Sequence, residues 1–141
     1  MRIMDRKDNW HDRHVLDILS HSQYQPTEEK LKSLTDLYES DPTIHAFSCV
    51  DNRRVMGVAV FKRLTASTVE IVSIAVDPAF RRQGIGSNLI SFAVKSLKYD
   101  EVRAETDDDA VGFYRRYGFD VVSLGEKYPG VIRYLCTLKL S

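Results

Sequence analysis

The residue types and spacing that are most informative about ligand chemistry lie together in one short turn. This turn reads Arg81-Arg82-Gln83-Gly84-Ile85-Gly86 and connects an expected strand, residues 69–76, to an expected helix, residues 86–97. The first turn of a helix carries unpaired backbone N–H groups and a partial positive charge, and glycine lets an anion approach the backbone closely. The turn therefore predicts a site for a phosphate-bearing molecule.

Two nucleotide-binding motifs use a similar turn but fit this sequence poorly. A mononucleotide P-loop requires Gly-x-x-x-x-Gly-Lys-Ser/Thr, and the chain contains no Gly-Lys-Ser/Thr. A dinucleotide fold requires Gly-x-Gly-x-x-Gly and an acidic residue about twenty positions further on. Gly84, Gly86 and Glu105 fit parts of that pattern, but Leu89 occupies the position of the third glycine. A tight loop whose glycines only permit the turn remains an alternative.

A second pattern runs from Asp107 to Phe119 and reads Asp-Asp-Asp-Ala-Val-Gly-Phe-Tyr-Arg-Arg-Tyr-Gly-Phe. With the Arg81-x-x-Gly84-x-Gly86 turn, it resembles the paired signatures of the GNAT acyltransferase superfamily. Those signatures are Arg/Gln-x-x-Gly-x-Gly/Ala and Asn-x-x-Ala-x-x-Phe-Tyr, the latter followed by a basic residue and Gly-Phe. Asp107 stands where asparagine is usual, and its ionised carboxylate can only accept hydrogen bonds. The resemblance covers residues 43–140.

The resemblance implies that the chain binds acetyl-CoA as a co-substrate and needs no metal. It implies that main-chain groups of Ile74, Ala75 and Val76 contact the pantetheine arm, where their strand separates from the strand at residues 101–106. The other residues implied to bind the cofactor come from the two motifs and are Arg81, Arg82, Gln83, Gly84, Ile85, Gly86, Ser87, Asp107, Ala110, Phe113 and Tyr114.

Acyl transfer to an amine needs a base for the amine, a donor for the oxyanion and an acid for the departing thiolate. Tyr114 is the candidate acid, because a phenol of pKa near 10 keeps its proton at neutral pH, and the resemblance implies that it points at the coenzyme sulfur. Glu70 is the candidate base: it is the one charged residue within residues 69–76, and some family members carry a glutamate there. Strict alternation places Glu70 on the same face as Ile74 and Val76. The implied oxyanion contact is the backbone N–H of Ile74. A packing role for Tyr114 and an exposed carboxylate for Glu70 are the alternatives.

The expected elements form a mixed α/β layer structure around one sheet. Helices are expected at residues 12–20, 27–40, 86–97 and 107–117, strands at 2–4, 43–50, 55–64, 69–76, 101–106, 119–124 and 131–140, and a loop at 125–130. The resemblance implies the GNAT fold, a mixed central sheet of about six to seven strands flanked by about four helices, in a single domain spanning residues 1–141.

The acceptor amine is not selected by the sequence. In the family it is shaped by the segment between the first two helices and by the loop before the last strand, here residues 21–25 and 126–130. These segments carry Tyr24, Glu126, Lys127 and Tyr128, a mixed set. Small-molecule amines and protein or peptide amines therefore both remain as acceptors, and the chain could be a monomer or a homodimer.

Composition limits the other classes of function. The 141 residues suit one domain, and 20 Lys+Arg balance 20 Asp+Glu, so no basic excess suggests a nucleic acid or a membrane surface. No apolar run reaches membrane length and no signal-peptide core follows Met1, so we expect a cytoplasmic protein. Cys49 and Cys136 lie in apolar runs and are interpreted as core residues. The four histidines show no metal-binding spacing, and His11 with His14 is interpreted as a solvated helix start.

These observations predict an N-acetyltransferase that moves the acetyl group of acetyl-CoA to a primary amine by direct attack in a ternary complex. No cysteine lies in either motif, which argues against a covalent acyl-enzyme. The first alternative is a non-catalytic acyl-CoA sensor or regulatory module. The second is a nucleotide-binding regulatory domain, which NAD or ATP would stabilise instead of coenzyme A.

Overall fold

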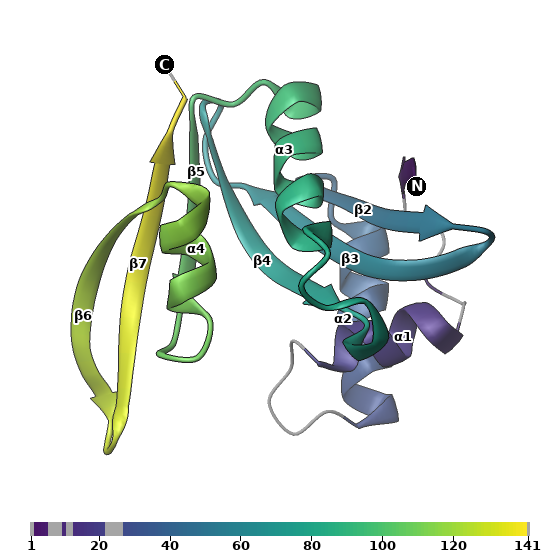
Figure 1. Cartoon of the computed structure of the whole chain (residues 1–141), viewed down its shortest axis with the longest axis horizontal. Helices are drawn as coiled ribbons and strands as arrows, with labels where there is room; N and C mark the ends of the chain where they lie inside the picture. The colour runs from purple at the N-terminus through teal and green to yellow at the C-terminus, as the bar shows by residue number, and fades with distance from the viewer. Residues whose placement is uncertain (1, 6–9, 11–12, 22–26, 141) are drawn as a thin grey trace.

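One seven-stranded mixed sheet organises the computed structural model, which describes residues 2–5, 10, 13–21 and 27–140. The strand order is β1-β2-β3-β4-β5-β7-β6 (Figure 1). The strands are β1 (Arg2–Asp5), β2 (Ile44–Asp51), β3 (Arg54–Arg63), β4 (Thr68–Val76), β5 (Glu101–Thr106), β6 (Asp120–Tyr128) and β7 (Val131–Lys139). The helices are α1 (Arg13–Ser20), α2 (Glu28–Ser40), the short 3-10 helix η1 (Pro78–Phe80), α3 (Ile85–Leu97) and α4 (Val111–Tyr117). The expected mixed α/β architecture is confirmed.

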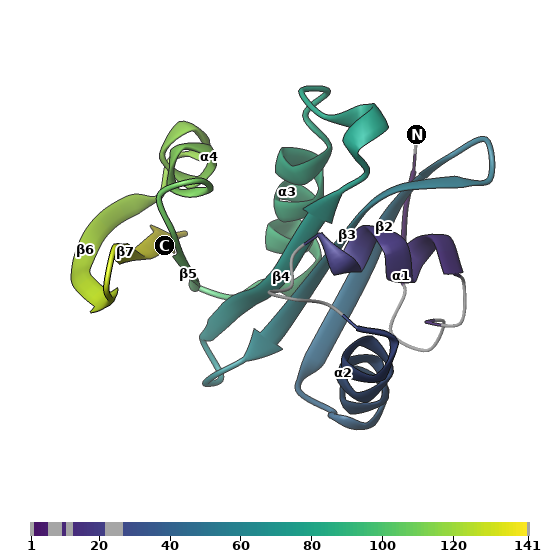
Figure 2. The same cartoon turned by 90° about the horizontal axis from the view of Figure 1, so that it is seen from below.

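The helices cover the two faces of the sheet in pairs. Seen from below, α3 and α4 lie on one side of the sheet, and α1 and α2 lie on the other (Figure 2). Each pair has its own apolar cluster. Leu89 of α3 and Tyr114 of α4 pack with Val69 and Val102, whereas Leu19 of α1 and Tyr38 of α2 pack in the second cluster. The sheet thus separates an α3/α4 face from an α1/α2 face.

Local chemistry explains where several elements begin and end. The β2–β3 hairpin turns through Asn52 and Arg53, with φ values of 48° and 65°, which is the positive-φ pair that a two-residue hairpin requires. The side chain of Thr27 caps α2 by accepting a hydrogen bond from the backbone N–H of Lys30 at 3.1 Å. Gly118 ends α4 with φ of 120°.

The parallel pair β4–β5 is joined only at its beginning. Thr68, Val69 and Glu70 pair with Glu101, Val102 and Arg103, and no further partners follow. β4 continues to Val76 and β5 to Thr106, so the two strands diverge toward their C-terminal ends (Figure 1). The divergence leaves the β5-facing edge of β4, from residue 71 to residue 76, without a strand partner.

A β-bulge overturns the expected alternation along β4. The register with β3 passes from Val60 opposite Ser73 to Phe61 opposite Ile71, so Val72 is an extra residue. Val69, Ile71, Ile74 and Val76 all pack in the α3/α4 cluster, whereas Val72 and Ala75 pack in the α1/α2 cluster. The prediction that Glu70 shares a face with Ile74 and Val76 is therefore wrong, because one extra residue reverses the side-chain parity.

Two further boundaries differ from expectation. Residues 125–128 belong to β6 and not to a loop, since the strand passes two register shifts and stays paired until Tyr128 meets Val131. Gly125 supplies a positive φ of 84° between those shifts. α4 begins at Val111, not at Asp107. Asp107 instead accepts hydrogen bonds from the backbone N–H groups of Asp109 and Ala110, at 3.1 and 3.2 Å, in the turn before the helix.

Candidate active site

A pocket of about 440 Å³ lies where β4, the glycine turn, α3 and α4 meet. Most of its lining was expected from the two motifs. The residues that line it are Ile74, Ala75, Val76, Phe80, Arg81, Arg82, Gly84, Ile85, Gly86, Ser87, Ala110, Phe113, Tyr114 and Arg116. Tertiary structure therefore brings the two motifs into one cavity, beside the edge of β4 that lacks a strand partner.

The glycine turn provides the polar end of this pocket. Gly84 is the N-cap of α3 and has φ of 77°, a left-handed conformation that favours glycine. A Cβ built on Gly84 would meet no atom within 4 Å, so the space above it is open to a ligand. The first-turn backbone N–H groups of α3 and the cationic side chains of Arg81 and Arg82 border the same pocket. These residues fit a pyrophosphate group.

Gly86 allows α3 and α4 to approach each other across the diverging strands. A Cβ built on Gly86 would lie 3.1 Å from the Cζ atom of Phe113, which is closer than ordinary contact. Phe113 itself lines the pocket and packs edge-on against Tyr114, with ring centroids 5.1 Å apart. The absence of a side chain at the second glycine of the turn thus leaves room for the Phe113 ring between the two motifs.

Tyr114 is buried at the α4 side of the pocket. Its side chain is 5% exposed and packs with Phe119 and, in the same cluster, Cys136. Burial, and to a smaller extent the nearby Cys136 thiol, raises the pKa of Tyr114 well above its ordinary value. No described residue forms a hydrogen bond with its hydroxyl. The hydroxyl oxygen is not among the fully buried atoms that lack a partner. A neutral phenol that borders a pocket and has no protein partner is suited to donate a proton to a ligand.

Glu70 lies away from the pocket, on the opposite face of the sheet. Its chain neighbours Val69 and Ile71 both pack in the α3/α4 cluster, so the side chain of Glu70 points to the α1/α2 face. It is half-buried, with Lys62 of β3 and Arg103 of β5 as its cross-strand neighbours. Glu70 ends the paired part of β4 and β5 and therefore stands where the two strands begin to diverge.

The sequence missed two residues of the pocket. Phe80, at the end of η1, and Arg116, on α4, both line it. Arg116 was visible only as the basic residue of the second motif, and Phe80 as an aromatic residue just before the Arg81 turn. Gln83 and Asp107, by contrast, are not among the lining residues, and their expected cofactor contacts stay predictions.

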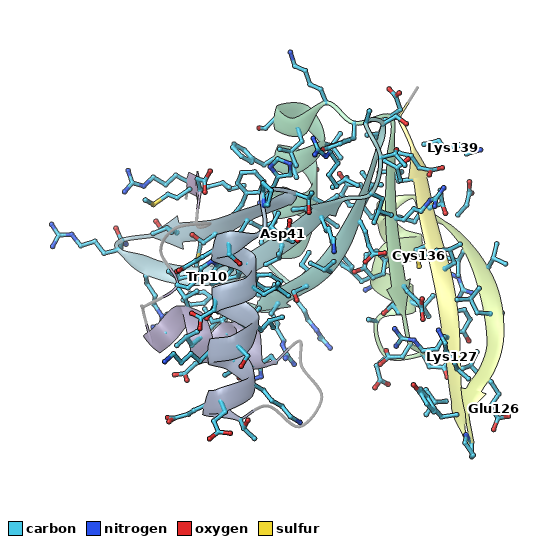
Figure 3. The ribbon with its side chains drawn as sticks, turned by 180° about the vertical axis from the view of Figure 1, so that it is seen from behind. Trp10, Asp41, Glu126, Lys127, Cys136 and Lys139 are labelled. Carbon is cyan, nitrogen blue, oxygen red and sulfur yellow. The ribbon has the colours of Figure 1, made fainter. Side chains whose placement is uncertain are left out.

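The residues expected near the acceptor lie on the β6–β7 hairpin. Glu126 and Lys127 lie toward the tip of the hairpin (Figure 3). Oε1 of Glu126 accepts a hydrogen bond from the backbone N–H of Gly130 at 2.6 Å, and Nζ of Lys127 lies 3.2 Å from Oε1 of Glu105. The Tyr128 side chain is exposed. Tyr24 and the other residues at 22–25 lie outside the described part of the chain.

The two cysteines lie in the core, and the described side chains form no metal-binding cluster. Cys49 and Cys136 are both free and fully buried, which confirms their expected place in the core. Within the described ranges, no group of three or more His, Cys, Asp or Glu side chains could hold a metal ion.

None of the described helices combines the length and the apolar character needed to cross a membrane.

Two curated relatives of the chain are N-alpha-acetyltransferases. Over 76 residues the chain is 36% identical to the N-alpha-acetyltransferase RimI of Mycobacterium tuberculosis, covering 51% of this chain and 48% of that protein. It is 38% identical over 77 residues to N-alpha-acetyltransferase 30 of Dictyostelium discoideum, covering 48% and 42%. Less than half the length of each of these curated relatives is matched.

Solved structures share the fold at low sequence identity. A GNAT family acetyltransferase from Elizabethkingia anophelis with acetyl-CoA bound has a TM-score of 0.71 at 21% identity, covering 99% of this chain and 97% of that one. A ribosomal-protein-alanine N-acetyltransferase from Escherichia coli has a TM-score of 0.77 at 18% identity, covering 99% and 95%. The model of the acetyltransferase (GNAT) family matches residues 12–119. The chain is therefore a member of the GNAT acetyltransferase family.

Proposed function

We propose that this chain is an N-acetyltransferase that transfers the acetyl group of acetyl-CoA to a primary amine by direct attack in a ternary complex. One observation carries the proposal. A single pocket joins the glycine turn at the start of α3 to Tyr114 of α4, along the edge of β4 that has no strand partner. The pocket offers three features in order along its length. The anion site suits the pyrophosphate of coenzyme A, the unpaired main-chain groups suit the pantetheine amides, and the neutral phenol suits the thiol end.

The binding residues follow from this order. Arg81, Arg82, Gly84 and the backbone of residues 85–87 would hold the pyrophosphate. Main-chain groups of residues 74–76 would pair with the pantetheine arm, as an added strand pairs with a free sheet edge. Ala110 and Phe113 would form the apolar wall opposite. Gln83 and Asp107 complete the predicted set.

Tyr114 is proposed as the general acid. Acetyl-CoA supplies an activated acyl group on a thioester sulfur, which leaves more readily when it receives a proton. The raised pKa keeps the proton on the Tyr114 hydroxyl throughout the neutral range. Because no described residue competes for this hydroxyl, its proton is free to reach a sulfur atom in the pocket.

Glu70 is proposed as the general base, acting directly or through water. The proton that leaves the amine and the proton that reaches the sulfur belong to different atoms, so base and acid need not be neighbours. Glu70 faces the α1/α2 side at the point where β4 and β5 diverge, whereas Tyr114 packs on the α3/α4 side. An amine that enters from the α1/α2 side would therefore meet Glu70 first. The backbone N–H of Ile74 remains the proposed oxyanion donor.

Peptides with a free N-terminus are the first acceptors to test, because two relatives of the chain are N-alpha-acetyltransferases. Thiol release from acetyl-CoA would be followed with such a peptide, with the same peptide acetylated at its N-terminus but carrying a free lysine, and with a polyamine and an aminoglycoside. We expect turnover with at least one of these amines. Tight calorimetric binding of coenzyme A without turnover would instead establish the sensor alternative, and stabilisation by NAD or ATP but not coenzyme A would establish the nucleotide-binding alternative.

A further inference from the structure

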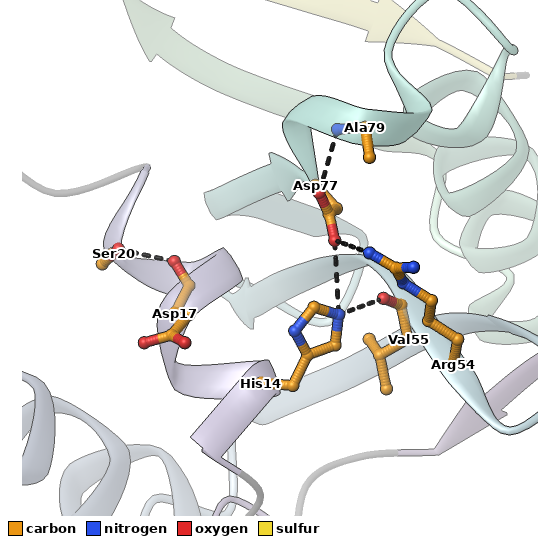
Figure 4. A network of polar contacts seen from close by, with 7 residues as sticks. All are labelled: His14, Asp17, Ser20, Arg54, Val55, Asp77 and Ala79. Carbon is orange, nitrogen blue, oxygen red and sulfur yellow. Dashed lines mark hydrogen bonds and ion pairs between the residues drawn. The ribbon is translucent and has the colours of Figure 1, made fainter.

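Three polar side chains outside the pocket meet where α1, β3 and the end of β4 come together. They are His14 of α1, Arg54 at the start of β3 and Asp77 between β4 and η1 (Figure 4). None of them lines the pocket. His14 lies in the first turn of α1, as expected of a helix start, but its side chain is only 36% exposed and belongs to this cluster. His11, expected beside it, lies outside the described part of the chain.

Asp77 is the centre of the cluster. It is only 7% exposed, and its Oδ1 accepts a hydrogen bond from the backbone N–H of Ala79 at 2.9 Å, which caps η1. Its Oδ2 lies 3.3 Å from Nε2 of His14 and 3.6 Å from a guanidinium nitrogen of Arg54. The pKa of Asp77 is lowered, first by the Ala79 hydrogen bond and then by the charges of Arg54 and His14. A nearly buried carboxylate is thus held in its ionised form.

The protonation of His14 follows from its partners. Nε2 of His14 lies 2.9 Å from the carbonyl oxygen of Val55 as well as 3.3 Å from the Asp77 carboxylate (Figure 4). Both partners can only accept a hydrogen bond, so Nε2 must carry the hydrogen. His14 therefore links α1 to β3 and to the segment that follows β4.

The cluster is coupled to the wall of the pocket through Phe80. The backbone C=O of Asp77 accepts a hydrogen bond from the N–H of Phe80 at 2.8 Å, and the guanidinium group of Arg54 lies 4.9 Å from the centre of the Phe80 ring. Phe80 lines the pocket and immediately precedes Arg81 and Arg82, which also line it. The ionised Asp77 side chain and the Arg54 cation thus fix the backbone that enters the glycine turn.

We propose that His14, Arg54 and Asp77 are positioning residues for the cofactor turn, and that they set the affinity for the pyrophosphate end of coenzyme A without taking part in acyl transfer. This inference rests on the proposed function, because it takes coenzyme A as the ligand. His14 belongs to α1, on the α1/α2 face of the sheet. Under this inference, the position of α1 therefore also affects the binding site on the α3/α4 face.

The test compares Asp77→Asn with Glu105→Gln as a matched control. Glu105 is likewise a carboxylate held by two cations, with Lys127 at 3.2 Å and Arg133 at 3.3 Å, but it does not line the pocket or contact the turn. Calorimetry would measure binding of coenzyme A and of S-acetylpantetheine, which lacks the pyrophosphate. We expect Asp77→Asn to weaken coenzyme A binding about tenfold, as loss of a charge-assisted contact predicts, and to leave S-acetylpantetheine binding and kcat unchanged while KM for acetyl-CoA rises.

The outcomes are distinguishable. Equal loss of affinity for both ligands, or the same loss in Glu105→Gln, would mean general destabilisation and would overturn the inference. Unchanged coenzyme A affinity in Asp77→Asn would also overturn it and leave the proposed function intact. If the wild-type chain binds no coenzyme A, the proposed function fails together with the inference. His14→Gln, which keeps a neutral donor, should retain more affinity than His14→Ala; equal affinities would remove His14 from the positioning set.

Discussion

Replacing Tyr114 by phenylalanine should lower the rate of acetyl transfer and leave the stability of the fold unchanged. The hydroxyl belongs to a side chain that is 5% exposed and forms no hydrogen bond with any described residue. Removing it breaks no hydrogen bond to a described residue. The hydroxyl oxygen is not among the fully buried atoms that lack a partner, so its removal also relieves no desolvation cost. We therefore expect Tyr114→Phe to change the free energy of unfolding by no more than about 0.5 kcal/mol.

The same substitution should lower the rate of acetyl transfer. If the Tyr114 hydroxyl protonates the thiolate, its loss should lower kcat about 10²-fold or more, the usual contribution of a positioned general acid. Coenzyme A affinity should change little, because the ring and its packing against Phe113 and Phe119 remain. Thiol release from acetyl-CoA with an accepted amine measures the first quantity, and calorimetry measures the second.

Tyr117→Phe is the matched control one turn away on α4. The hydroxyl of Tyr117 forms a hydrogen bond of 2.8 Å with Oγ of Ser91, and Tyr117 does not line the pocket. Its loss should lower the free energy of unfolding by about 1 kcal/mol and leave kcat unchanged. A Tyr114→Phe variant that turns over at the wild-type rate would remove Tyr114 from the mechanism. A loss of stability as large as that of Tyr117→Phe would show that the Tyr114 hydroxyl has a partner after all.

Three further substitutions test Glu70 as the general base, Gly86 in the cofactor turn, and the contribution of ionised Asp77 to stability at low pH. Glu70→Gln should lower kcat roughly 10²-fold and change the pH profile of the rate; an identical profile would exclude Glu70 as the base. Gly86→Ala places a Cβ 3.1 Å from the Phe113 ring and should cost about 1–3 kcal/mol of stability and weaken coenzyme A binding, whereas normal binding would show that the ring moves away freely. The pKa of Asp77 is lowered in the folded chain, so its ionised form stabilises the fold above the unfolded pKa of about 4, and this contribution is lost as the pH falls through the lower folded pKa. Urea unfolding of Asp77→Asn should therefore show a deficit at neutral pH that shrinks at low pH; a deficit independent of pH would contradict the assignment.

Much of the local structure was predictable because its causes are local. The strand Glu101–Thr106 and the end of α3 at Leu97 agree with the sequence, since apolar periodicity and nearby turn residues determine them. The glycine turn was found from its residue types alone, because a left-handed N-cap at Gly84 needs a residue without a Cβ.

The faces of β4 were not predictable in the same way. Alternation gives the face of each residue only while pairing stays regular, and the bulge at Val72 depends on how β3 lies against β4. This bulge places Glu70 on the face opposite to Ile74. The β6 strand was underestimated for a related reason, because its paired stretch from Gly125 to Tyr128 depends on register shifts against β7.

The sequence by itself was enough to predict the family and to single out the residues of the glycine turn, since these depend only on residue type and spacing along the chain. Only the tertiary structure decided that β4 and β5 part directly after Glu70, and that Phe80 and Arg116 line the pocket with the two motifs. It also decided that Glu70 and Tyr114 lie on opposite faces of the sheet, and that His14 reaches Asp77 across 63 positions of the chain. These features depend on strand pairing and packing between distant segments, which local residue patterns do not encode.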